Sequence, residues 1–329
     1  MVVEPLKSNI QISIIIISML ALLAWLATFA FVSIEVPIIN YKEHILYYHV
    51  FNNNISFFAR QIITLIIILA GAIFINFLSI EQEITSKTNY LPAFLYILMA
   101  FSATTKISIE PILTANLLVL PSLYFLINSY RQPTAISDCF KAGFFIGLAS
   151  FFCIDYIVLF PLNFLALTIL RPFNWREWAI MLLGLITPLY IDICINYLAT
   201  GHAFEVFKTM NDAIYSIEKP VFSVYYLAFM FVMILALLLA LARYLNKGFG
   251  SKVKTQKAKY VLLWMCILCL LMVFFEQTTD MLLLPCIIPL SIFIGDYLAE
   301  IKELKKANAL LVLFIVGFSI IHLHALGII

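Results

Sequence analysis

Acidic, basic and histidine side chains gather in one polar segment of an otherwise apolar chain. Glu35 and Glu43 are carboxylates that could take a proton from a nucleophile, and His44 could act as a metal ligand or proton carrier. Lys42 and Arg60 carry positive charge of the kind that holds a phosphate. This composition predicts an acid–base site beside an anion site. Ordinary solvation of a loop accounts for the same residues, so both interpretations stay open.

Two more charged residues stand in short polar breaks between apolar runs. Lys106 would be a further cation for a phosphate, and Asp155 a further acid. Asp155 has a second interpretation as the N-cap of a helix over 156–170, since aspartate is a preferred N-cap residue. The chain has no P-loop, dinucleotide-binding or Gly-x-Ser-x-Gly motif, so ATP-driven transport within this chain is not expected.

The composition dictates where such a site must sit. Hydrophobic residues make up 64% of the 329 residues, charged residues 12%, and the net charge is +2. A soluble domain is about 45–50% apolar and about 25% charged. These values exclude a soluble globular protein, a disordered chain and a nucleic-acid-binding protein. They predict an all-α, polytopic membrane protein of about 11 spans, within a range of about 10–12, because each span needs about 20 apolar residues.

The apolar runs divide the chain into spans within a single membrane domain, 1–329. The first run exceeds the core of a signal peptide, which is about 7–15 residues long, so we expect it to remain as a span. The predicted spans cover residues 10–32, 61–80, 89–102, 111–130, 142–153, 156–170, 177–198, 221–245, 260–275, 281–299 and 307–327.

The region 142–170 has three possible forms: one long tilted span, a re-entrant pair or two short helices. A single straight span would bury Asp155 deep in hydrocarbon, which is costly. Both flanks of the region are basic, with Lys141 before it and Arg171 after it. The sequence therefore favours a hairpin that returns to the side from which it came.

Lys and Arg residues sort to one side of the predicted spans. With the N-terminus inside, 15 of the 20 Lys and Arg residues are cytoplasmic, and Arg171 and Arg176 among them are interpreted as topology anchors. We therefore expect a multi-pass protein with a cytoplasmic N-terminus and a C-terminus on the outer side. The loop 246–259 is its most basic segment, a topology anchor or a docking surface for anionic lipids or a partner.

The outer loops are longer and more acidic. The first, residues 33–60, contains Tyr41, Ile45 and Tyr48 at helical spacing, and the second, residues 200–220, contains a similar apolar stripe. Each pattern predicts an amphipathic helix that lies in the membrane interface.

The middle of the chain resembles a known superfamily. Residues 141–150 read KAGFFIGLAS, residues 170–178 read LRPFNWREW, and the stretch ends at Pro188. This order resembles the central segment of GT-C-type glycosyltransferases, which are polytopic enzymes that take a sugar from a polyprenyl-phosphate carrier. The string LRPFNWREW is also similar to an uncharacterised family of Gram-negative inner-membrane proteins. This similarity implies that the membrane is a bacterial inner membrane and that the outer side is the periplasm. The resemblance covers about residues 110–190, roughly a quarter of the chain, and its motifs are mostly apolar.

The resemblance implies a site in the first outer loop, where GT-C enzymes carry an essential acid, in some members an acidic pair followed by tyrosine. Here Glu43-His44-Ile-Leu-Tyr47 stands in that loop, and histidine replaces the second acid. Glu43, Glu35 and His44 would be catalytic, with a divalent cation such as Mg²⁺ or Mn²⁺ as a candidate cofactor. The residues implied in substrate binding are Lys42, Tyr47, Arg60, Lys106 and Asp155.

Three functions remain open at this level. The first is sugar transfer from a polyprenyl-phosphate donor at the outer face. The second is a non-catalytic membrane subunit or scaffold of a cell-envelope assembly, because catalytic motifs are weak. The third is a lipid or solute transporter. Membrane lipid is a partner in all three, envelope proteins in the second, and nucleic acid in none.

Overall fold

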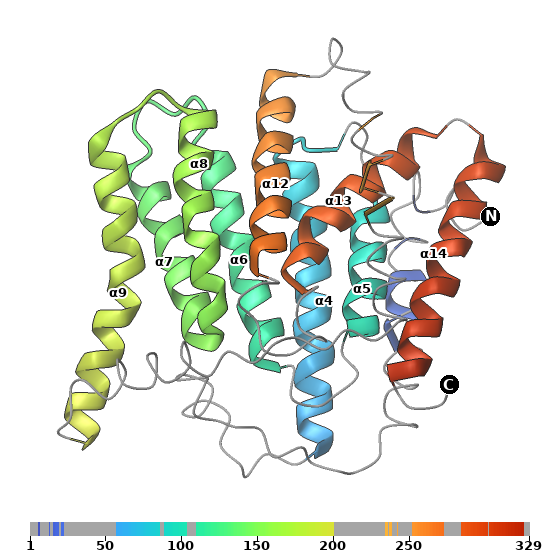
Figure 1. Ribbon diagram of the computed structural model, residues 1–329, viewed down its shortest axis with the longest axis horizontal. Coiled ribbons are helices and arrows are strands. Elements are labelled where there is room, and N and C mark those ends of the chain that lie inside the picture. The colour runs from blue at the N-terminus through green and yellow to red at the C-terminus, as the bar shows by residue number, and fades with distance from the viewer. Residues whose placement is uncertain are drawn as a thin grey trace.

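The computed structural model describes residues 6, 13, 16–19, 21–22, 57–85, 89–103, 110–200, 234–235, 237–238, 242, 252–272, 284–301 and 303–325 (Figure 1). Every regular element among these residues is helical, which confirms the all-α prediction for this part of the chain. The elements are α4 (Phe57–Glu81), α5 (Leu91–Ala103), α6 (Glu110–Asn128), α7 (Ile136–Phe152), the 3₁₀ helix η3 (Ile154–Leu159), α8 (Phe160–Leu170), α9 (Trp175–Thr200), α12 (Val253–Met272), α13 (Leu284–Glu300) and α14 (Leu304–Ala325).

The helices stand side by side as a bundle (Figure 1). α4, α6, α8 and α13 run toward one end, and α5, α7, α9, α12 and α14 run back. We call the end where α7, α9 and α12 begin the basic end, because it carries most of the Lys and Arg residues of the described part. The other is the opposite end.

Nine of the predicted spans coincide with observed helices within a few residues. The largest departure is at α12, which begins at Val253 rather than near residue 260. Lys254, Lys257 and Lys259 therefore lie on a helix, which corrects the prediction that 246–259 is all loop. Lysine, glutamine and alanine are good helix formers, so this polar stretch continues the apolar helix outward.

One helix in the described part of the chain, Phe58–Glu81, is long and apolar enough to cross a membrane. Three apolar helical segments are shorter: Leu91–Phe101, Ile112–Asn128 and Tyr156–Leu170. The number of spans stays a prediction.

The hairpin interpretation of residues 142–170 agrees with the structure. α7 ends where Cys153 takes an extended conformation (φ −147°, ψ 114°), and η3 leads directly into α8. At the end of α8, the Arg171 side chain contacts the carbonyl oxygen of Ser129, just before α7. The chain has therefore returned to the end at which α7 began.

Asp155 is not the N-cap of α8. It lies within η3, where the capping position is Cys153, and the N-cap of α8 is Leu159. Neither cap makes a side-chain hydrogen bond. The chain enters α8 directly from 3₁₀ geometry, so few amide groups of the first turn are left for a side chain to cap.

α7 and α9 run parallel and pack without side chains between them at two glycines. A Cβ atom at Gly143 would collide with the carbonyl oxygen of Met181, and one at Gly147 would lie 2.6 Å from that of Leu185. Close approach of this kind needs a residue without a side chain. The GxxxG spacing thus fixes the register in which α9 lies against α7.

We predict that Gly143→Ala lowers the free energy of unfolding by about 1–3 kcal/mol, because the added methyl group forces the two backbones apart. Five of the six cysteines are buried, so the reaction of their thiols with a fluorogenic maleimide during heating reports unfolding. Gly317→Ala is the matched control, since nothing lies within 4 Å of that position. The control should be neutral or stabilising by up to about 1 kcal/mol. Equal melting of both variants would contradict the packing argument.

Candidate functional site

Most residues of the predicted outer site lie outside the described part of the chain. These are Glu35, Lys42, Glu43, His44, Tyr47 and Lys106. The predicted amphipathic helices in 33–60 and 200–220 fall there too, except for the start of α4. The catalytic assignments therefore stay predictions.

Arg60 lies in the first turn of α4, at the opposite end of the bundle, and is only 6% exposed. A cation with so little contact with solvent is unusual, since arginine is almost never buried unless it is paired. The backbone of Asp155 lies in η3, also toward this end.

The 3₁₀ helix η3 lies toward the same end of the bundle as Arg60. The Tyr124 ring of α6 contacts the rings of Phe74 and Phe77 in α4, which runs in the same direction. Ile112 lies twelve residues before Tyr124 in α6, and the same number of residues before the Phe74–Phe77 contact in α4 leads to about residue 63. The Tyr156 hydroxyl donates to the Ile112 carbonyl oxygen at 3.3 Å, so η3 contacts the first turn of α6, toward the same end of the bundle as Arg60.

The turn that carries Asp155 is set back from the end of α9. Gly147 lies against Leu185, and α7 and α9 run in parallel, so Cys153 is level with about residue 191. α9 continues from there to Thr200, which is about 13 Å at the rise of an α-helix. The α7–η3–α8 hairpin is therefore shorter than the helix beside it.

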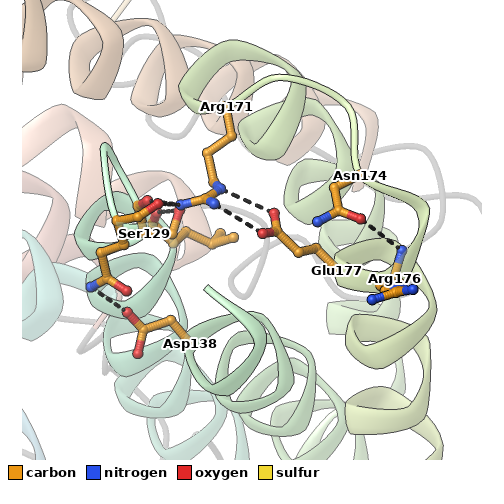
Figure 2. Close-up of polar contacts among 8 residues, drawn as sticks. Ser129, Asp138, Arg171, Asn174, Arg176 and Glu177 are labelled. Atoms are coloured by element: carbon orange, nitrogen blue, oxygen red, sulfur yellow. Dashed lines mark hydrogen bonds and ion pairs between the residues drawn. The ribbon is translucent and has the colours of Figure 1, made fainter. Parts of the chain in front are cut away.

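The best-defined polar cluster lies at the basic end, in the turn between α8 and α9 (Figure 2). Pro172 pushes the preceding residue out of helical geometry, and Arg171 is extended (φ −137°, ψ 156°). Asn174 then begins α9, and its side-chain oxygen accepts from the backbone amide of Arg176 at 3.2 Å. This local geometry brings Arg171 and Glu177 face to face.

Arg171 and Glu177 form a bidentate ion pair. The guanidinium nitrogens Nε and Nη2 donate to the two carboxylate oxygens at 3.0 and 2.9 Å, and the two side chains are 9% and 3% exposed. Nη1 donates to the carbonyl oxygens of Ser129 at 2.6 Å and Gln132 at 2.8 Å. One side chain thus ties the α8–α9 turn to the α6–α7 turn, whereas the sequence suggested only a topology anchor.

Asp138 completes the cluster from the first turn of α7. Its Oδ2 atom accepts from the side-chain amides of Asn128 at 2.9 Å and Gln132 at 3.0 Å, and the residue is 8% exposed. The positive end of the α7 dipole also favours a carboxylate here. These hydrogen bonds and the ion pair tie together the ends of α6, α7, α8 and α9, and buried charges satisfied in this way define a fixed structural clamp rather than a reactive site.

A second buried ion pair joins α12 to α13. Lys259 Nζ lies 2.6 Å from Asp296 Oδ2, and each side chain is 9% exposed. Nearby at the rim, Lys252 pairs with Glu83 at 2.8 Å, and both are exposed. That hydrogen bond and the charge of Lys252 lower the pKa of Glu83 below its usual value.

We expect Asp296→Asn to lower the free energy of unfolding by about 1.5–3 kcal/mol. Asparagine keeps an acceptor oxygen for Lys259, but it removes the negative charge that lies 2.6 Å from the buried ammonium. The exposed Glu303→Gln variant breaks an ion pair with Lys306 at the same end and should cost no more than about 0.5 kcal/mol. Maleimide-monitored melting compares the two, and similar shifts would mean that Lys259 finds compensation elsewhere.

In the described part of the chain, no group of three or more His, Cys, Asp or Glu side chains could hold a metal ion. Cys266 and Cys269, which have the spacing of redox or zinc motifs, are buried free thiols in α12. The predicted divalent cation would depend on Glu43, Glu35 and His44, which lie outside this part.

A protein-family model described as a family of unknown function (DUF6427) matches residues 19–327. No curated protein and no solved structure matches the chain.

Proposed function

Since the chain belongs to the DUF6427 family, a family of unknown function, we propose a function from its own residues. The protein is a polytopic protein of a bacterial inner membrane that transfers a sugar from a polyprenyl-phosphate donor at the outer face. The opposite end of the bundle faces the periplasm, and the basic end faces the cytoplasm.

Apolar side chains on the outside of the bundle support the membrane assignment. α4 exposes Ile66 and Ile73, the latter at 71%, and α9 exposes Leu183, Ile186 and Tyr190. Each apolar Å² left in water costs about 25 cal/mol, and soluble proteins rarely expose such long stripes. In contact with lipid acyl chains, these faces carry no such cost of exposing apolar surface to water. Together with the concentration of Lys and Arg at one end, this carries the assignment.

The position and burial of Arg60 best support binding of a lipid phosphate. Its guanidinium belongs to the first turn of a membrane-length helix, and in the proposed orientation this turn would lie near the phosphate groups of outer-leaflet lipids. A largely buried guanidinium binds phosphate more strongly than a fully solvated one. The turn at Asp155 ends before α9 does, so the last turns of α9 project beyond it at the same end of the bundle.

Glu43 is the proposed base, with Glu35 as the alternative and His44 as a metal ligand or proton carrier. A carboxylate beside the anomeric carbon would take the proton of the acceptor hydroxyl, whose oxygen forms the new glycosidic bond. The bond from the anomeric carbon to phosphate oxygen breaks, and the leaving polyprenyl phosphate keeps the electron pair. Arg60, Lys42 and Lys106 would stabilise that negative charge. The resemblance of residues 110–190 to GT-C enzymes supports the same class.

The experiment is complementation of a deletion strain. Cells that lack the gene receive the wild type, Glu43→Gln, Glu35→Gln or the exposed control Glu303→Gln, and mass spectrometry follows envelope glycans and lipid-linked sugars. We expect the deletion and the Glu43 variant to lose one glycan component and accumulate its polyprenyl-phosphate donor, while the control behaves as the wild type. Unchanged glycans in the deletion strain would contradict a transferase.

A non-catalytic membrane subunit is the second candidate, and α9 is the observation that favours it. α9 lies at the edge of the bundle in Figure 1, and its outer face stays apolar to Tyr197 and Leu198, beyond the tip of the hairpin. Such a face fits a helix of another membrane protein as well as it fits lipid. The test is photo-cross-linking at Leu198 in the membrane, followed by affinity purification. A membrane subunit should yield one stoichiometric protein partner, whereas a helix that faces lipid should yield only cross-linked lipid.

A further inference from the structure

Two cations converge on one aromatic ring at the basic end. The Arg131 guanidinium carbon lies 5.3 Å from the centre of the Tyr130 ring, and Lys257 Nζ lies 5.2 Å from the same centre. Tyr130 and Arg131 belong to the α6–α7 turn, whereas Lys257 comes from the second turn of α12. The tertiary structure thus brings together two positive charges that are more than 120 residues apart in the chain.

Each cation is held in its position. Arg131 has a left-handed backbone conformation (φ 59°), which costs energy in a residue with a side chain. Lys257 donates a hydrogen bond to the Leu170 carbonyl oxygen at the end of α8, at 3.3 Å. Attraction to the face of the tyrosine ring stabilises both charges. Arg131 is exposed and Lys257 is half-buried, so both charges remain accessible to an anion from outside the bundle.

The surrounding carboxylates are engaged elsewhere. Among the described residues, Asp138 accepts from Asn128 and Gln132, and Glu177 pairs with Arg171. In this part of the chain neither Arg131 nor Lys257 forms an ion pair. The segment 244–259 also contains no Asp or Glu. Two like charges beside one ring repel each other unless an anion lies between or beside them.

We propose that Tyr130, Arg131 and Lys257 form a binding site for the phosphate of an anionic phospholipid in the cytoplasmic leaflet. Arg131 would contact the phosphate oxygens through its fork of N–H donors, and Lys257 would add charge, while the Tyr130 ring fixes both. Basic sites between helices on the cytoplasmic side are a known way of holding anionic lipid headgroups.

Exposed apolar residues at the same end identify a lipid rather than a free phosphate. Ile136 and Phe140 of α7 follow Arg131 by five and nine residues and are partly exposed, and Phe173, just before α9, and Trp175, at its start, are 72% and 65% exposed. Such side chains mark the interface where headgroups and acyl chains meet. The proposal rests on the membrane orientation given above, and it is independent of sugar transfer.

The test measures which lipid stays bound to the purified protein. The protein is incorporated into nanodiscs that contain phosphatidylglycerol and phosphatidylcholine, and native mass spectrometry then identifies the retained lipid. The variants are Arg131→Asn and Lys257→Gln, because asparagine tolerates the left-handed conformation and glutamine can still donate to the Leu170 carbonyl. The matched control is Lys305→Gln with Lys306→Gln, which removes two charges at the same end on α14.

We expect the wild type to retain phosphatidylglycerol selectively, and each single variant to lose about fivefold in retention, since a cation near a lipid phosphate contributes about that factor. The control should retain the lipid as the wild type does. Equal retention by variants and wild type would overturn the proposal. So would displacement of the lipid by millimolar inorganic phosphate, which would indicate a site for free phosphate. Because the readout is lipid retention, failure here leaves the transferase proposal standing, and the reverse also holds.

Discussion

Replacing Arg171 with alanine should lower the free energy of unfolding by about 3–5 kcal/mol, the cost of leaving one partner of a buried ion pair uncompensated. Glu177 would keep a charge that is 3% exposed, and the carbonyl groups of Ser129 and Gln132 would lose their donor. Maleimide-monitored melting measures the change through the buried cysteines.

Three further variants separate the charge from the packing. Arg171→Lys keeps a positive charge but cannot form two parallel bonds to the carboxylate, so it should restore only part of the loss. The double variant Arg171→Met with Glu177→Met removes both charges and should be more stable than the single alanine variant. Lys306→Ala breaks an ion pair whose side chains are 71% and 65% exposed and should cost at most about 1 kcal/mol. If Lys306→Ala and Arg171→Ala melted alike, the clamp would be no stronger than a surface pair.

The second large effect concerns the proposed reaction. Glu43→Gln should reduce sugar transfer by about 10²–10⁴-fold, the usual contribution of a general base, because glutamine has the shape of glutamate but cannot take a proton. The rate is measured as loss of donor from membranes that contain equal amounts of each variant. Folding is checked separately by cysteine protection, which a change in an outer loop should leave intact.

Glu35→Gln is the matched variant in the same loop. If Glu43 is the base, Glu35→Gln should reduce the rate by less than tenfold, since it then acts only through the local charge. A large loss at Glu35 with none at Glu43 would move the base to Glu35. If neither variant changes the rate, the first outer loop does not supply the base, and the transferase proposal fails at its central residue.

The positions of the helices could be predicted from the sequence, because long apolar runs and their polar breaks are local properties. The predicted spans 61–80 and 177–198 lie within α4 and α9, and the hairpin at 142–170 follows from Asp155 between basic flanks. Both depend on the cost of placing charge in hydrocarbon, which each residue carries by its type alone.

The partners of the charged residues were decided by the tertiary structure. Arg171 and Ser129 are 42 positions apart, and Lys259 and Asp296 are 37 positions apart, so no local pattern indicates that they meet. Arg171 has the same residue type and a similar setting in the sequence to Arg176, yet only Arg171 is buried in an ion pair. Pro172 makes the backbone of Arg171 extended, and the packing of α6, α7 and α9 brings the partners of Arg171 into reach. The free energy of a buried charge depends on those neighbours, which the local sequence does not specify.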